Sequence, residues 1–140
     1  MKPDASSALR KSILPVVISL LIAGCASTGS GPGIAYRGGV LTDGKGMTVY
    51  TYLKDSFNKS VCTGPCEANW PPLRPAANEY GMNDLHPFKR DDGTLQWSFE
   101  GKPLYLWVKD AKPGDKTGQG VANAWSTVIE PPTPKVVSDY

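Results

Sequence analysis

The strongest constraint on the fold is an internal repeat. Residues 49–55 read VYTYLKD, and residues 104–110, 55 positions later, read LYLWVKD. Trp70 and Trp125 are separated by the same offset. Self-similarity at a fixed period is typical of supersecondary units that bury their apolar faces against each other. The sequence therefore predicts two copies of one unit, which together make up most of the chain.

The first unit has the pattern of a β-hairpin followed by a helical turn. Strands are expected at residues 40–42 and 47–53, joined by a tight turn with the sequence Asp43-Gly44-Lys45-Gly46. Side chains alternate between the two faces of a strand, so Tyr50 and Tyr52 lie on one face of 47–53 and Val49 and Leu53 on the other. Large side chains on both faces favour a strand that is packed on both sides. Pro65 is expected to begin a short helix and Pro71-Pro72 to end it.

The second unit repeats this order after residues 74–90, which are expected to be irregular. Its predicted elements are strands at 94–99 and 103–108 joined by a turn at 100–102, a helical turn at 121–125 and a last strand at 126–129. The predicted fold class is mainly β with short helical turns. Two pseudosymmetric hairpin-plus-helical-turn repeats form one compact domain, with the aromatic strands at its centre.

The N-terminal segment has the pattern of an export signal. Lys2, Arg10 and Lys11 make its start positive, and the apolar run 13–23 is too short to span a bilayer as a mature helix. The run leads into Ile-Ala-Gly before Cys25. This ending resembles the bacterial lipobox, where a diacylglycerol is attached to the thiol and the peptide is cut ahead of it.

The lipobox resemblance implies an address and a division of the chain. Residues 1–24 are expected to be the lipoprotein signal peptide, and Cys25 the lipidated start of a flexible tether, residues 25–33. Residue 26 is Ala, not the Asp that favours inner-membrane retention, which implies the outer membrane with the domain facing the periplasm. The remaining divisions are the domain at 34–131, its units at about 36–73 and 92–130, and a Pro-rich tail at 132–140.

The charge balance limits the class of partner. The chain has 15 Lys and Arg against 13 Asp and Glu, and removal of the signal takes away three basic residues and one acidic residue. The mature protein is therefore formally neutral. A nucleic-acid binder normally carries a surplus of clustered Lys and Arg to neutralise phosphates. We expect attachment to the membrane through lipid, no nucleic-acid partner, and a protein or small-molecule partner of unknown identity.

Cys62 and Cys66 are the two cysteines left once Cys25 is assigned to lipid attachment. In an exported, oxidising setting they favour a disulfide. They enclose three residues, which differs from the Cys-x-x-Cys spacing of thioredoxin-like sites and of haem attachment. A structural disulfide is predicted, and a thiol-redox or metal-binding role is the alternative.

Asp55 and Asp110 follow the equivalent strands of the two units. Paired carboxylates suggest catalysis or metal binding. A carboxylate at such a place can instead accept hydrogen bonds from backbone N–H groups of the turn that follows. We predict the structural role for both residues, because duplication of the unit explains the pair without chemistry. No catalytic constellation is predicted, and the protein is expected not to be an enzyme.

Soft side chains offer an alternative metal site. Met47, Met82 and His86, the single histidine, could join Cys62 or Cys66 around copper, since soft ligands select Cu(I). Nothing in their spacing requires this arrangement, so no metal or cofactor is predicted.

The aromatic residues are expected to form the core of this small domain, because each buries a large area. An exposed aromatic shelf for sugars is the alternative, which would make the chain a carbohydrate-binding module. The residues concerned are Trp70, Trp97, Trp107, Trp125, Tyr50, Tyr52 and Tyr105.

Five segments together resemble one protein family. YTYLKD, CTGPCEANWPPL, QWSFEGKPLYLWVKD, PGDKTGQG and a closing Trp125 are similar to the secreted bacterial repeats, predicted lipoproteins, named for a Tyr-x-(Phe/Trp/Tyr)-x-x-Asp motif. The likeness covers roughly residues 36–131. Family members often carry His after the second Trp, where this chain has Ser126. The motif positions, to which the family attaches no activity, are Tyr50, Tyr52, Asp55, Trp70, Tyr105, Trp107, Asp110 and Trp125.

Together these patterns predict an envelope-anchored lipoprotein whose domain is a non-catalytic binding or structural module. Two alternatives stay open. One is a periplasmic copper or thiol-redox accessory protein, and the other is a carbohydrate-binding module.

Overall fold

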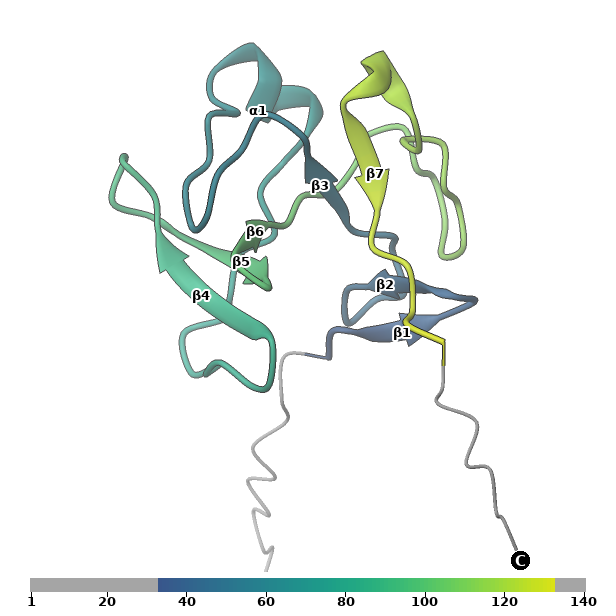
Figure 1. The fold of residues 1–140 in the computed structure, drawn as a ribbon, viewed down its shortest axis with the longest axis horizontal. Coiled ribbons are helices and arrows are strands. Elements are labelled where there is room, and N and C mark those ends of the chain that lie inside the picture. The colour runs from purple at the N-terminus through teal and green to yellow at the C-terminus, as the bar shows by residue number, and fades with distance from the viewer. Residues whose placement is uncertain (1–32, 133–140) are drawn as a thin grey trace, which may run out of the picture.

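Short β-strands make up most of the regular structure in the computed structural model, which describes residues 33–132 (Figure 1). The elements are β1 (Ala35–Arg37), β2 (Val40–Thr42), β3 (Tyr50–Tyr52), α1 (Pro65–Asn69), β4 (Leu85–Lys89), β5 (Leu95–Phe99), β6 (Lys102–Pro103), the 3-10 helix η1 (Val121–Asn123) and β7 (Trp125–Thr127). The mainly β fold class with short helical turns is thus confirmed. The predicted signal peptide, Cys25, residues 26–32 of the tether and residues 133–140 lie outside the described residues.

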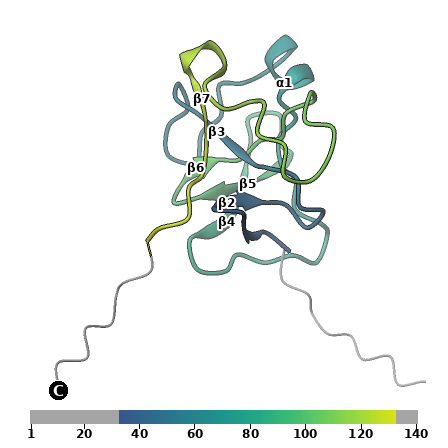
Figure 2. The same ribbon diagram turned by 90° about the vertical axis from the view of Figure 1, so that its right-hand side faces the viewer.

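The strands form three small antiparallel sheets. β1 pairs with β2, β3 pairs with β7, and β4, β5 and β6 form the third sheet in that order. The pair of β3 and β7 joins segments that are far apart in the sequence and lie side by side in the fold (Figures 1 and 2). Within residues 33–132, no helix has the length and apolar character needed to cross a membrane.

An approximate twofold relation connects the two repeats. β3 of the first repeat pairs with β7, which closes the second repeat. In the equivalent place, the Leu106 N–H donates to the Pro71 carbonyl at 2.8 Å and the Leu73 N–H donates to the Leu104 carbonyl at 2.9 Å. Each repeat therefore pairs its central strand segment with the closing segment of the other repeat. The repeats interlock, and they are not two separate hairpins placed face to face.

Two buried clusters fill the interior. One is aliphatic around a single tryptophan and contains Leu41, Val49, Leu73, Leu85, Trp97 and Leu104. The other is aromatic and contains Tyr50, Cys62, Trp70, Tyr105 and Trp125. The aromatic cluster holds two equivalent pairs from the repeats, which agrees with the prediction that the aromatic strands lie at the centre.

The turns and the helix start follow local sequence chemistry. Asp43 begins the predicted tight turn: its N–H donates to the Met47 carbonyl at 2.8 Å, and its Oδ1 accepts the N–H groups of Lys45 and Met47. Gly46 adopts φ of 82° there, a left-handed conformation that glycine adopts without steric cost. The helix α1 starts at Pro65, as predicted, since proline has no N–H to leave unpaired in the first turn.

The prediction that residues 74–90 are irregular was wrong for the last part of this segment, because Leu85–Lys89 forms strand β4. Sequence patterns do not predict this strand because it contains Pro87, and proline has no N–H group to donate to the hydrogen bonds of a sheet. It is tolerated here because β4 is the edge of its sheet and pairs with β5 alone.

The predicted strands 47–53 and 103–108 are also longer than the observed ones. The partner changes along each segment: Thr48 bridges Thr42, Tyr50 bridges Tyr105, and only Tyr50–Tyr52 runs continuously against β7. The expectation of burial on both faces fails at the end of the segment, where Leu53 is 78% exposed.

Candidate functional site

Two tyrosine–aspartate pairs cross from one repeat to the other. The Tyr50 hydroxyl donates to Asp110 Oδ2 at 2.6 Å, and the Tyr105 hydroxyl donates to Asp55 Oδ2 at 2.6 Å. Each tyrosine therefore binds the aspartate of the other motif copy, not the one five residues after it. Burial, and next the bonded aspartate, raise the pKa of both tyrosine hydroxyls above their ordinary value.

The second oxygen of each aspartate holds the loop that follows it. Asp55 Oδ1 accepts the Val61 N–H at 2.8 Å, while Asp110 Oδ1 accepts the Thr117 N–H at 2.9 Å and its hydroxyl at 2.6 Å. The backbone N–H contacts are those that the structural interpretation of the aspartates predicts. Burial raises the pKa of Asp55 despite the hydrogen bonds from Tyr105 and Val61.

Four aromatic rings form a stacked column through the domain. Tyr52 stacks on Trp125 with ring centroids 4.3 Å apart, Trp125 on Trp70 at 3.8 Å, and Trp70 on Trp107 at 3.9 Å. The two central rings are the tryptophans related by the repeat offset, and they are nearly parallel, with an interplanar angle of 4°. Trp70 and Trp125 are buried, whereas Tyr52 and Trp107, at the ends of the column, are half-buried. Both ends are thus accessible from a surface hollow.

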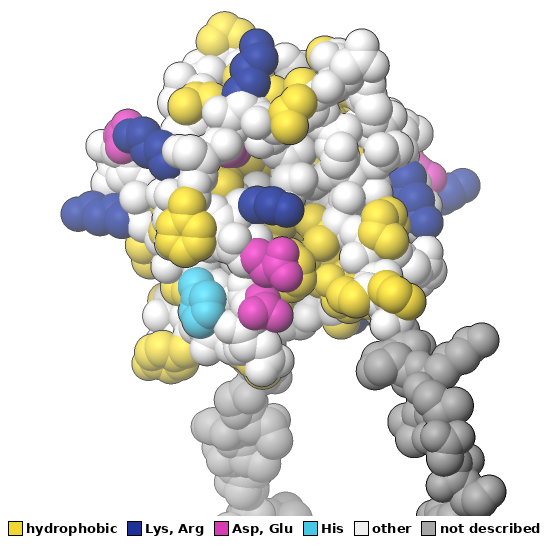
Figure 3. All heavy atoms as spheres, in the orientation of Figure 1, with side chains coloured by type: hydrophobic (Ala, Val, Ile, Leu, Met, Phe, Trp, Pro, Cys, Tyr) yellow, Lys and Arg dark blue, Asp and Glu magenta, His cyan; other side chains and the backbone are white. Residues whose placement is uncertain are grey.

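The larger hollow lies at the Tyr52 end, has a volume of about 490 Å³, and is lined by Tyr36, Thr51, Tyr52, Glu100, Lys102 and Ser126 among others. A neighbouring hollow of about 280 Å³ shares Tyr52, Glu100 and Lys102 and extends to Phe57. We call the two together the Tyr52 groove. On the face shown in Figure 3, basic and acidic side chains lie next to recessed hydrophobic atoms near the middle of the molecule.

A smaller hollow lies at the other end of the column. It has a volume of about 180 Å³ and is lined mainly by Met47, Pro71, Leu106, Trp107 and Val108, and we call it the Trp107 hollow. These positions lie 55 residues from Lys102, Ser126, Thr51, Tyr52 and Leu53, all of which line the Tyr52 groove. The two sites are therefore equivalent under the repeat. At Lys102, Ser126 and Thr51 the groove is polar where the Trp107 hollow is apolar, and Thr48 and Asp110 also line the Trp107 hollow.

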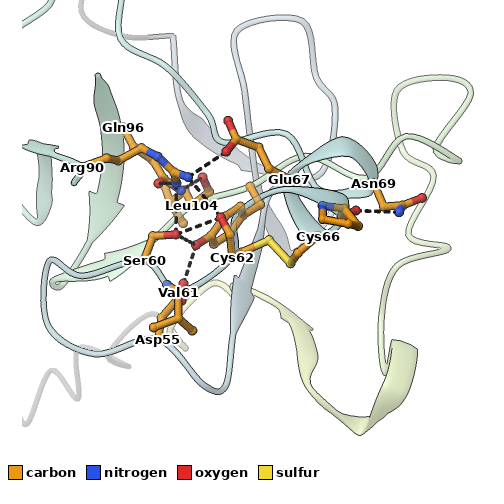
Figure 4. The surroundings of a disulfide bond; sticks show 12 residues. Asp55, Ser60, Val61, Cys62, Cys66, Glu67, Asn69, Arg90, Gln96 and Leu104 are labelled. Carbon is orange, nitrogen blue, oxygen red and sulfur yellow. Dashed lines mark hydrogen bonds and ion pairs between the residues drawn. A yellow bond between two sulfur atoms is a disulfide. The ribbon is translucent and has the colours of Figure 1, made fainter. Parts of the chain in front are cut away.

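The predicted disulfide between Cys62 and Cys66 is present and ties α1 to the loop before it (Figure 4). Beside it, buried Arg90 donates to the Cys62 carbonyl, Ser60 Oγ and Glu67 Oε2, each at 3.0 Å. Ser60 Oγ also lies 2.6 Å from the Tyr105 hydroxyl. A chain of polar contacts thus connects the disulfide loop with the Tyr105–Asp55 pair.

The residues of the predicted copper alternative are distributed over different parts of the fold. Met47 lines the Trp107 hollow, while Met82 and His86 lie at the start of the β4 hairpin, exposed. The sulfur atoms of Cys62 and Cys66 are bonded to each other. Among residues 33–132, no three His, Cys, Asp or Glu side chains are grouped so that they could hold a metal ion.

Sequence reasoning missed the polar lining of the Tyr52 groove. No sequence motif includes the three groove residues Lys102, Glu100 and Tyr36. The offset of 55 residues could have identified Lys102, because it aligns with Met47, and a charged residue in place of an apolar one marks a position where the repeats diverge. Arg90 also belongs to no sequence motif, and the structure buries it.

Comparison with known families agrees with the internal symmetry. A family model described as a secreted repeat of unknown function matches the chain twice, at residues 35–74 and 87–129. No curated protein and no solved structure matches it.

Proposed function

Since the chain belongs to this family of secreted repeats, we propose that it is an exported protein, anchored by lipid at Cys25, whose domain has a non-catalytic binding or structural role. We also propose that the chain is one of the repeats defined by the Tyr-x-(Phe/Trp/Tyr)-x-x-Asp motif. Its location is the outer membrane, with the domain facing the periplasm.

The cross-repeat tyrosine–aspartate pairs are the observation that carries the non-catalytic role. A carboxylate that serves as a general base must have an oxygen free to accept the proton that it removes, within hydrogen-bond reach. Both oxygens of Asp55 and of Asp110 accept hydrogen bonds from the protein itself. The two carboxylates therefore have a structural role: their hydrogen bonds to Val61 and Thr117 hold the loops that follow the two motif copies.

The position of the chain ends is compatible with a membrane tether. Residues 33 and 132 lie at the same end of the domain, near β1, and α1 and η1 lie at the opposite end (Figures 1 and 2). A tether leading to residue 33 would direct the α1 end away from the membrane and leave the groove between the two ends accessible to solvent.

Metabolic labelling of the full-length chain with an alkyne analogue of palmitate tests the anchor. We expect label in the wild-type protein and recovery in the outer-membrane fraction. Cys25→Ser is expected to lose the label and to accumulate as the larger, uncleaved precursor. The matched control is the double variant Cys62→Ser with Cys66→Ser, which removes both disulfide-bonded cysteines of the domain and is expected to keep the label. An unlabelled wild-type protein in the soluble periplasmic fraction would overturn the proposal.

A further inference from the structure

We propose that the Tyr52 groove binds a carbohydrate chain, with pyranose rings laid on Tyr52 and Phe57. This inference rests on the proposed non-catalytic binding role and adds the class of ligand. Its basis is a groove of suitable size with an aromatic surface, charged groups that have no partner within the described residues, and an equivalent hollow in the same molecule that is apolar at three of the corresponding positions.

The size and the aromatic surface of the groove suit a sugar chain. Its main hollow, about 490 Å³, falls in the range of about 300–1,000 Å³ that is usual for small-ligand sites. One face of Tyr52 is held by the Trp125 ring at 4.3 Å, which restrains the rotation of its side chain. The C–H bonds on one face of a pyranose carry partial positive charge, and an aromatic ring face is negative. A pre-ordered ring of this kind attracts a sugar at little cost in side-chain entropy.

Phe57 extends the aromatic surface at the other end of the groove. Its side chain is 78% exposed, so the ring is open to a ligand from solvent. Its ring lies against Gly101, where an added Cβ would come within 2.2 Å of the ring carbon Cδ2. Gly101 therefore makes room for the ring beside the hollow that contains Tyr52. Two aromatic platforms in one continuous groove indicate a ligand of several rings.

Polar groups in the groove have unused hydrogen-bonding capacity. The Tyr36 hydroxyl is shielded from solvent and has no hydrogen-bond partner among the described residues, so a ligand reaches it only when the Tyr36 side chain shifts. Neither Lys102 nor Glu100 forms an ion pair within residues 33–132. A carboxylate that accepts, an ammonium that donates, and hydroxyls that do both match the edge of a sugar ring.

The Trp107 hollow is the internal comparison. It has an aromatic ring at the same place, but Met47, Pro71 and Leu106 occupy the positions equivalent to Lys102, Ser126 and Thr51. A purely apolar ligand would be served by either site. The three polar replacements occur only in the Tyr52 groove, which is also the larger of the two, so the ligand there has polar edges as well as an apolar face.

Calorimetric titration of the full-length protein tests the site. The protein is kept in an amine-oxide detergent, which has no sugar headgroup, and the probes are cellotetraose and chitotetraose. We expect at least one to bind with a Kd below about 1 mM. Lys102→Met, which installs the residue of the equivalent hollow, is expected to weaken binding about tenfold, as loss of a charge-assisted hydrogen bond does. Lys112→Met makes the same charge change on an exposed loop and is expected to bind like the wild type.

Phe57→Ala supplies a second variant, because Phe57 is exposed and its truncation leaves the core intact. We expect it to weaken the binding of the tetrasaccharide more than that of the matching disaccharide. The inference is overturned if neither tetrasaccharide binds, if Lys102→Met and Lys112→Met bind equally well, or if tetra-alanine binds in place of both sugars. If no sugar binds but the protein carries the palmitate label at Cys25, the carbohydrate proposal fails and the anchoring proposal stands. If an unlabelled protein binds sugar, the anchoring proposal fails and the carbohydrate proposal stands.

Discussion

Tyr50 and Tyr105 exchange two backbone hydrogen bonds, each residue donating its N–H to the carbonyl of the other at 2.9 Å. The two residues are equivalent under the repeat, so the approximate twofold axis passes between them. Both are fully buried. The rings stacked around this point come from both repeats, and the β3–β7 pair crosses from one repeat to the other. The centre of the fold is therefore shared, and neither repeat has a complete core.

Neither repeat alone is expected to fold as a monomer. Residues 26–80 contain β3 but lack its partner β7, and they contain Trp70 without Trp125. Residues 81–140 contain β7 without β3, and Trp125 without Trp70. We expect each fragment, produced separately, to give narrow amide dispersion in NMR spectra and no near-ultraviolet circular dichroism. An equimolar mixture is expected to recover the spectrum of the intact chain. A single fragment that is folded and monomeric at micromolar concentration would contradict the interlocked arrangement.

A double-mutant cycle is expected to show that each tyrosine is coupled to the aspartate of the other motif copy. Tyr50→Phe leaves a buried carboxylate oxygen of Asp110 unpaired and is expected to cost roughly 1–3 kcal/mol of unfolding free energy. Together with Asp110→Asn, it is expected to show a coupling energy of about 0.5–3 kcal/mol, the range for residues in one hydrogen-bonded network. Denaturant unfolding of residues 26–140, exported behind a cleavable signal peptide, measures both quantities.

The control for this cycle is Tyr50→Phe combined with Asp55→Asn, a pair within one motif copy. Asp55 bonds to Tyr105 and not to Tyr50, so we expect this pair to show clearly weaker coupling. A stronger coupling for Tyr50 with Asp55 than with Asp110 would refute the crossed pairing.

Much of the architecture could be predicted because it depends on local chemistry and on the repeat. The turn at Asp43, the helix start at Pro65 and the paired tryptophans follow from residue types at fixed spacing. The crossed partners could not be predicted. A repeat shows that two units are equivalent, but it does not show whether a tyrosine reaches the aspartate of its own copy or that of the other. Only the position of the twofold axis between Tyr50 and Tyr105 decides this.

The candidate groove was hidden from sequence analysis for a different reason. Tyr52, Lys102 and Ser126 come from three distant segments, and no spacing rule connects them. Their contrast with Trp107, Met47 and Pro71 becomes meaningful only when the structure shows that both sets line hollows.

Reduction of the Cys62–Cys66 disulfide is expected to weaken the fold without abolishing it. The bond closes a short loop, with a sequence separation of 4, so the chain-entropy contribution is small, roughly 2 kcal/mol. Arg90 holds the same loop through three hydrogen bonds and is buried. We therefore expect Arg90→Ala to destabilise the domain more than reduction does, because it leaves several buried acceptors unpaired, at about 1–3 kcal/mol each. Unfolding by denaturant, with and without reductant, provides the comparison. A disulfide that contributed more than Arg90 would contradict this order.

Alkaline pH is expected to destabilise the domain through Tyr50 and Tyr105. Their pKa values are raised in the folded protein, chiefly by burial. Above about pH 10 the unfolded chain loses these protons while the folded chain retains them, so the folded state binds more protons and its stability falls as the pH rises.

The slope of that loss identifies the residues responsible. Each tyrosine contributes up to about 1.4 kcal/mol per pH unit once its unfolded form is ionised. Below about pH 9 neither form ionises, and unfolding free energy is expected not to depend on these groups. Tyr105→Phe lowers stability at pH 8 by removing the bond to Asp55. The variant also lacks one titrating phenol, so its alkaline slope should be shallower than that of the wild type. Denaturant midpoints measured from pH 8 to pH 11.5 separate the two effects. A slope unchanged by Tyr105→Phe would show that other groups cause the alkaline loss, since lysines titrate in the same range and are present in both proteins.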